Sequence, residues 1–331
     1  MPGARRGALL LSASVLLLAV VVLSLTVGAR AINPLNALAA LFDPDAPDAE
    51  VIRSLRVPRT VVGLVVGAGL AVAGVIMQAL TRNPLADPRI LGVSAGASLG
   101  VVLAMSVFGL SLLTQYVWFG IAGALVAGMA GYLVAARSRD GASPVTLALA
   151  GAALDASIGG AVYAILAASA TTFDGYRFWV AGSLAGRTPQ IALQVAPFLI
   201  AGLLLAAWLA RGLDALVLGG DMAAGLGHKV ARVRLAGAFA VALLTGAAVA
   251  AAGPIGFIGL AIPHLARALV GGAHRWILAL SLILGPVMLL SADVIGRVVL
   301  PTGEVPAGIV TAVIGAPLLI VLVRRARLVA A

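Results

Sequence analysis

The side chains that could do chemistry in this chain are few and lie far apart in the sequence. Asp155 and Asp293 each stand inside a long apolar run, and His228, His264 and His274 are isolated from one another. The absence of cysteine excludes thiolate nucleophiles and cysteine-bound metals. Because no Ser, His and Asp arrangement typical of hydrolases is evident either, we predict no catalytic residue, no metal site and no cofactor.

A P-loop is excluded by the position of the single lysine of the chain. A P-loop requires the pattern Gly-x4-Gly-Lys-Ser/Thr, whereas Lys229 is followed by Val230. We therefore interpret the chain as a protein without enzymatic activity. If ATP drives its function, the hydrolysis must occur on a partner chain.

The composition requires a membrane. Hydrophobic residues make up 62% of the 331 residues and charged residues only 10%, against about 45–50% and about 25% in soluble domains. Since a membrane-spanning helix needs roughly 20 apolar residues, we predict an all-α polytopic membrane protein of one domain, residues 1–331. Its ten predicted spans are residues 8–28, 60–80, 90–108, 115–135, 144–168, 191–210, 233–252, 255–270, 276–299 and 305–323.

The charges lie between these spans and predict the orientation. An even number of spans places both termini on one side, and fifteen of the 22 basic residues lie on that side. The positive-inside rule makes it the cytoplasmic side. The net charge of +10 is thus explained by topology, and we expect membrane lipid rather than nucleic acid as a partner. The first span is longer than the core of a signal peptide, which is about 7–15 residues, so we interpret it as a retained helix.

Small residues recur at four-residue spacing within spans, for example at Gly63 and Gly67, at Gly120, Ala124 and Gly128, and at Gly151 and Gly159 on either side of Asp155. This spacing is typical of closely packed membrane helices. Residues 73–76 (AGVI), followed by a proline at 84, also match residues 252–255 (AGPI), followed by a proline at 263. This suggests an inverted repeat of spans 2–5 and 7–10, a common device of transporters, with coincidence as the alternative.

Three stretches are the most specific. The first comprises residues 56–60 (RVPRT), 74–78 (GVIMQ), 82–88 (RNPLADP) and 91–97 (LGVSAGA). The second is 253–267 (GPIGFIGLAIPHLAR), and the third is 292–297 (ADVIGR) followed by 304–317 (EVPAGIVTAVIGAP). In this order and spacing they resemble the FecCD-type permeases, the membrane subunits of binding-protein-dependent ABC importers for ferric siderophores, haem and cobalamin. The resemblance covers residues 55–325, and segment 83–97 is more similar to the siderophore members.

The resemblance implies a function and a set of partners. We expect a permease subunit that translocates an iron(III)-siderophore, or a related chelate such as haem or cobalamin, into the cytoplasm. The partners would be a cytoplasmic ABC ATPase dimer, a periplasmic or lipid-anchored substrate-binding protein, and a second permease subunit, identical or paralogous. The location would be the bacterial cytoplasmic (inner) membrane, with both termini cytoplasmic and the path between the two permeases.

The resemblance also implies roles for particular residues. Arg56, Arg59 and Arg297, at the outer ends of spans two and nine, would dock the binding protein, because the guanidinium fork suits carboxylates. The alternative is that they are interfacial arginines whose charged ends reach the headgroups. The cytoplasmic coupling loop, residues 212–234, would contact the ATPase, and a solvated loop is the alternative. Its coupling residues would be Asp221, Ala223, Gly225, Leu226 and Gly227, with Asp221 near the start of a short helix.

The two intramembrane carboxylates leave another function open. Asp293 is one helical turn from Arg297, which favours a structural pair. Asp155 would either line the path or pair across helices, because a carboxylate within a span needs a partner or water. Together with the repeat, these carboxylates also fit a proton-coupled secondary transporter, which is the alternative to the ABC permease.

Overall fold

The computed structural model describes residues 3–28, 30–138, 142–225, 227 and 229–330. This part of the chain is helical and contains no strand, as predicted. The elements are α1 (Gly3–Thr26), α2 (Pro34–Phe42), the π-helix η1 (Val51–Arg56), α3 (Val57–Thr81), the 3-10 helix η2 (Pro88–Leu91), α4 (Val93–Phe108), α5 (Leu113–Ala136), α6 (Pro144–Ala168), α7 (Ala170–Val180), α8 (Pro189–Val217), α9 (Gly220–Gly225), α10 (Val230–Ala252), α11 (Ile258–Val270), α12 (His274–Val298) and α13 (Ala307–Ala330).

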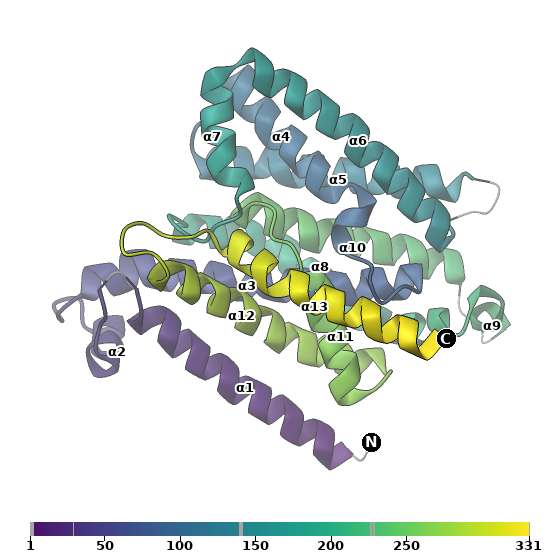
Figure 1. The fold of residues 1–331 in the computed structure, drawn as a ribbon, viewed down its shortest axis with the longest axis horizontal. Coiled ribbons are helices and arrows are strands. Elements are labelled where there is room, and N and C mark those ends of the chain that lie inside the picture. Colours follow the sequence, from purple (N-terminus) through teal and green to yellow (C-terminus); the bar gives the residue numbers. More distant parts are fainter. Residues whose placement is uncertain (1–2, 29, 139–141, 226, 228, 331) are drawn as a thin grey trace.

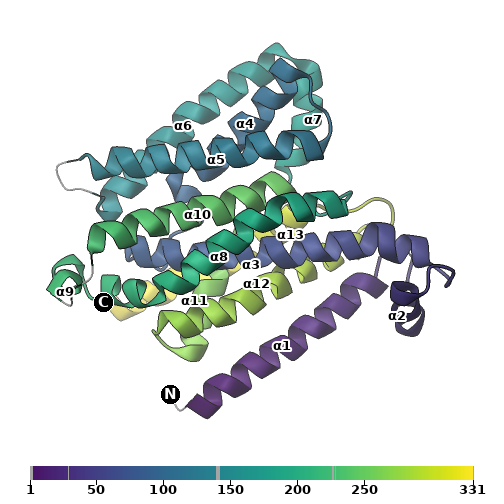
Figure 2. The same cartoon turned by 180° about the vertical axis from the view of Figure 1, so that it is seen from behind.

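The long helices form a bundle with two distinct ends (Figure 1). The α2 end carries α2 and the start of α3, whereas the α9 end carries α9, the start of α1 and the end of α13. Helices α4 to α7 form one group, at the top of the view, and α1 lies along the opposite edge (Figures 1 and 2). The central helices lie between this group and α1 (Figure 2).

Two helices form the centre of the bundle. From Val62 to Thr81 almost every residue of α3 is buried, and α10 is buried along most of its length. Because other helices cover α3 and α10 on all sides, both helices carry apolar residues on every face. By contrast, α1 and α8 expose large apolar side chains such as Leu11, Leu204 and Trp208, as helices in contact with lipid do.

Length and hydropathy support a multi-pass membrane protein but do not confirm the count of ten spans. Seven helices of the described residues are long and apolar enough to cross: α1, η1 with α3, α5, α6, α8, α10 and α12. The remaining three predicted spans coincide with shorter apolar helices, namely α4, α11 and residues Ala307–Pro317 of α13. Helices α4 and α11 are short because η2 and the non-helical residues 253–257 precede them.

Glycines set the closest helix contacts, as predicted for most of the small-residue positions. A Cβ atom at Gly67 would lie 2.8 Å from the carbonyl oxygen of Gly285, and one at Gly74 would lie 1.9 Å from that of Gly259. Helix α3 thereby touches α12 and α11 backbone to backbone. The prediction was wrong at Gly159, where a Cβ atom would meet nothing within 4 Å. This position of α6 faces open space.

The packing is reciprocal between the two halves of the chain. Central helix α3 packs against α11 and α12, and central helix α10 packs against α4 and α5. In the predicted repeat, α3 corresponds to α10, α4 to α11, and α5 to α12. Each central helix therefore contacts the second and third helices of the other half. This arrangement fits the inverted repeat, which stays a prediction.

The contrast between tight and open glycines gives a stability test. Gly160→Ala, in the open part of α6, should raise the free energy of unfolding by about 0.5–1 kcal/mol, because alanine restricts the unfolded chain and favours helix. Gly74→Ala is the same chemical change but forces α3 away from α11, and should lower it by about 1–3 kcal/mol. Thermal unfolding of the two variants in detergent measures the difference. Equal melting temperatures would contradict the α3–α11 contact.

Candidate functional site

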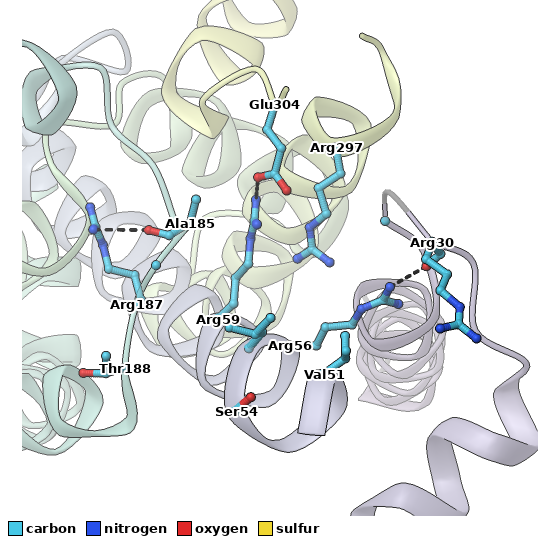
Figure 3. Close-up of a pocket in the computed structure, with 13 residues that line it drawn as sticks. Arg30, Val51, Ser54, Arg56, Arg59, Ala185, Arg187, Thr188, Arg297 and Glu304 are labelled. Atoms are coloured by element: carbon cyan, nitrogen blue, oxygen red, sulfur yellow. Dashed lines mark hydrogen bonds and ion pairs between the residues drawn. The ribbon is translucent and has the colours of Figure 1, made fainter. Parts of the chain in front are cut away.

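A cavity of about 460 Å³ opens at the α2 end. It lies between η1 and the start of α3, the end of α12, and the segment that leads into α8 (Figure 3). Figure 3 shows Arg59 reaching Glu304 beside Arg297, with Arg56 nearer to Arg30. Its charged lining residues are Arg30, Arg56, Arg59, Arg187, Arg297 and Glu304.

Local helix geometry places these arginines side by side. Arg56 is the last residue of η1 and Arg59 lies in the first turn of α3, three residues later and hence on the same face. Pro58 fits at the start of α3, where a missing N–H is not needed. Arg297 lies one turn after Asp293 near the end of α12. We call Arg56, Arg59, Asp293 and Arg297 the arginine cluster.

The carboxylate of Asp293 is the centre of this cluster. Its side chain is only 1% exposed. Arg59 donates to it from Nε, to Oδ2 at 2.9 Å and to Oδ1 at 3.2 Å, and from Nη2 to Oδ1 at 2.8 Å. Arg297 donates from Nε to Oδ2 at 3.1 Å. The predicted pair with Arg297 is therefore confirmed. The pair with Arg59, which joins α12 to α3, is an interhelical contact that sequence spacing did not predict.

The remaining donors of Arg56 and Arg297 hold the end of α1. Arg297 Nη1 donates to the carbonyl oxygen of Ser24 at 2.7 Å, and Arg56 Nη1 donates to that of Leu25 at 2.7 Å. The last carbonyl groups of a helix have no partner within it. The two arginines supply those partners, and their positive charge also suits the negative end of the helix dipole. The cluster therefore ties three helices together.

The predicted docking residues lie together but are largely engaged within the chain. Arg56 and Arg297 are only 7% and 5% exposed. Arg59 is more open, and its Nη2 atom also bonds Glu304 Oε2 at 2.8 Å. Arg30 and Arg53 are exposed at this end, and Arg30 pairs with Asp48 at 3.2 Å. Docking by the three predicted residues stays a prediction.

Arg187 is a lining residue that the sequence interpretation missed. It lies in the segment before α8, and its Nη1 atom donates to the carbonyl oxygen of Ala185 at 3.3 Å. Its Nε atom is buried and has no hydrogen-bond partner among the described residues. Burial lowers the pKa of this guanidinium below its ordinary value. In the sequence, the only signal for Arg187 was its position among the basic residues on the outer side of the membrane.

The expected coupling loop is shorter and more ordered than predicted. Helix α8 continues to Val217 and α10 begins at Val230, so the residues expected as loop 212–234 include the ends of both helices. Between them lies α9, with Asp221 in its first turn, as predicted. The two ends were assigned wrongly because their polar side chains resemble a loop in sequence.

The five predicted coupling residues differ in exposure. Ala223 is buried, whereas Gly225 and Gly227 are exposed. Gly227 has a φ of +81°, which suits glycine and strains other residues. Leu226 lies outside the described residues, and of Asp221 only the backbone is described. Residues 221–227, which we call the α9 segment, thus present small, exposed residues such as Gly225 and Gly227 beyond the ends of α8 and α10.

Asp155 lies in a different environment from Asp293. It is exposed in the middle of α6 and lines a cavity of about 860 Å³ formed with α4 and α7. The structure therefore separates the two predicted intramembrane carboxylates. One is buried between arginines, and the other opens into a cavity.

Residues 16–325 match the model of the FecCD transport family, which is nearly the whole bundle described above. The chain belongs to this family. The FecCD resemblance predicted from the three motifs is thus confirmed. The match includes the arginine cluster, the α9 segment and Asp155.

Related proteins agree over most of their length. The chain is 45% identical over 312 residues to the ferric enterobactin transport system permease protein FepD of Escherichia coli K12, covering 94% of this chain and 93% of that protein. It is 40% identical to the Fe(3+)-citrate import system permease protein YfmD of Bacillus subtilis, covering 92% and 91%. A solved chain described as an inward-facing metal-chelate type ABC transporter matches with a TM-score of 0.86 and 31% identity, covering 96% and 99%.

The arginine cluster yields a stability prediction. Asp293→Ala leaves the buried Arg297 and the half-buried Arg59 without their shared carboxylate, which should lower the free energy of unfolding by about 3–5 kcal/mol. Asp174→Ala removes a carboxylate from the exposed pair with Arg177 and should leave stability nearly unchanged. Melting temperatures of the purified variants compare the two. A similar small loss in both would show that the cluster does not hold the helices.

Proposed function

We propose that this chain is the membrane-spanning permease subunit of an ABC importer that moves an iron(III)-siderophore into the cytoplasm. The observation that carries the proposal is the end-to-end similarity to permeases named for ferric enterobactin and Fe(3+)-citrate. Those names favour iron(III) chelates over haem or cobalamin. The likeness in fold to a metal-chelate type ABC transporter supports the same class.

In this proposal the α9 end faces the cytoplasm and both termini lie there. The excess of basic residues on that side supports the orientation. The α9 segment, residues 221–227, would contact the ATPase dimer, since it projects beyond α8 and α10 (Figure 2). A second permease subunit, identical or paralogous, would complete the path, and the side of the bundle that carries Asp155 would face it.

The binding protein would dock at the α2 end. Arg53 and Arg30 supply exposed positive charge there, and Arg59 supplies a partly open guanidinium. Arg56 and Arg297 contribute charge from within the cluster and hold the surface rigid. Charges of this kind mainly orient and accelerate association and weaken with salt. The partner surface would therefore carry acidic residues.

The proton-coupled alternative loses one of its two candidate carboxylates. A proton carrier has to exchange its proton during transport, whereas Asp293 is held by two arginines and is 1% exposed. Only Asp155 remains open among the two. The ABC permease is therefore the better supported function.

Reconstitution into proteoliposomes tests the proposal. The permease would be combined with its ATPase and binding protein, and uptake of an iron(III)-siderophore measured with ATP inside the vesicles. We expect uptake to persist after the proton gradient is dissipated and to disappear when the lysine of the ATPase P-loop is replaced. Uptake that follows the proton gradient and needs no ATPase would instead establish secondary transport.

Gly225 allows a test of the coupling segment that does not disturb the chain itself. A Cβ atom at Gly225 would meet nothing within 4 Å, so Gly225→Trp should fold normally but obstruct a partner in contact with α9. We expect co-purification with the ATPase, or stimulation of its activity, to fall at least tenfold. Gly7→Trp is the matched control, because Gly7 is equally open and lies at the same end, on α1. Equal effects of both variants would remove the assignment of α9.

A further inference from the structure

A second cavity lies beside Asp155, away from the arginine cluster. It has a volume of about 860 Å³ and is enclosed by α4, α6 and α7, the upper group in Figure 1. Asp155 stands near the middle of α6 and contributes a carboxylate. Helix α4 contributes the hydroxyl groups of Ser94 and Ser98.

The face of α6 around Asp155 is unsuited to lipid. A carboxylate at this depth is unfavourable against hydrocarbon and requires water or a partner. Its neighbours on α6 are small: Ala156 is exposed, and a Cβ atom at Gly159 or Gly160 would meet nothing within 4 Å. Helices α1 and α8 instead expose leucine and tryptophan side chains. We therefore infer that the Asp155 face of α6 is bathed by water or occupied by a ligand.

The cavity lining carries one charge of each sign, from Asp155 and Arg177. Arg177 pairs with Asp174 at 3.3 Å, whereas Asp155 has no hydrogen bond or ion pair among the described residues. The hydroxyl oxygen of Ser94 is buried and also lacks a partner in the described part of the chain. A free carboxylate and a free hydroxyl group can both accept hydrogen bonds. A ligand with N–H donors would satisfy them.

Aromatic rings complete the cavity wall. Tyr163 on α6 is 75% exposed and Phe173 on α7 is 49% exposed, and both line the cavity with Tyr176. Aromatic faces attract organic cations, and their attraction adds to that of a nearby carboxylate. The part of the cavity next to Asp155 therefore favours a cationic group over an anionic one.

We propose that this cavity is a recognition site for an organic cation, a protonated amine carried on the periphery of the iron(III) chelate. The proposal rests on the permease function stated above and specifies its substrate class. A ferric hydroxamate that bears a free ammonium group would gain this contact with Asp155, whereas a chelate without a cationic group would not. Asp155 would bind the ammonium group, and Tyr163 and Phe173 would cover it.

Transport in the reconstituted importer tests the proposal with two matched probes. One is a linear ferric trihydroxamate that ends in a primary ammonium group, and the other is its neutral N-acetylated counterpart. The measured quantity is the ratio of their ATP-driven uptake rates. The binding protein is the same in every assay, so a change in this ratio between permease variants reports the permease alone.

We expect Asp155→Asn to lower the preference for the ammonium chelate about tenfold, a change typical of losing one charged contact. Asp155→Glu keeps the charge and should retain most of the preference. Asp45→Asn removes an exposed carboxylate at the α2 end, outside the cavity, and should leave the ratio unchanged. Recovery of each complex by size-exclusion chromatography shows that it has folded.

The contrary outcomes separate the two proposals. An equal ratio in the parent protein and Asp155→Asn would overturn the cation site. Uptake of a ferric tricatecholate without uptake of either hydroxamate would also overturn it but would leave the ABC permease function standing. If ATP drives uptake of none of the three chelates, the proposed function fails, and the cation site fails with it.

Discussion

The buried carboxylate of Asp293 determines how three helices meet at the α2 end. An ionised carboxylate inside a membrane bundle is unfavourable unless opposite charges and hydrogen-bond donors surround it. Arg59 from α3 and Arg297 from α12 supply both, and Arg297 also bonds the final carbonyl groups of α1. The geometry of α1, α3 and α12 at this end therefore follows from satisfying one charge.

The two ends and the side of the bundle differ in the charge and size of the residues that they expose. At the α2 end, arginines outnumber carboxylates around the cavity, but Arg56 and Arg297 are buried and Arg59 is paired with Glu304. At the α9 end, small exposed residues of α9 project beyond the long helices and leave room for a partner chain. On the side, Asp155 lacks an internal partner among the described residues, so its charge is available to a ligand. In the proposed function, substrate entry, energy coupling and recognition would thus use separate surfaces.

The sequence predicted the helices well and their polar contacts poorly, for physical reasons. Every predicted span coincides with a helix, because an apolar run of this length is a local property. The extension of α8 to Val217 was missed because Asp214 resembles a loop residue, yet its carboxylate accepts a hydrogen bond at 2.8 Å from the N–H of His274. The Asp293–Arg297 pair followed from four-residue spacing, whereas the Arg59 contact depends on tertiary packing.

The most direct test of this account is a double-mutant cycle on Arg59 and Asp293. Unfolding free energies would be measured in mixed micelles for Arg59→Ala, Asp293→Ala and the double variant. The account predicts that the double variant is less destabilised than the sum of the single variants, by at least about 1.5 kcal/mol, because each single variant already removes the Arg59–Asp293 ion pair and the double variant removes it only once. Additivity within about 0.5 kcal/mol would contradict the claim that this buried ion pair joins α3 to α12.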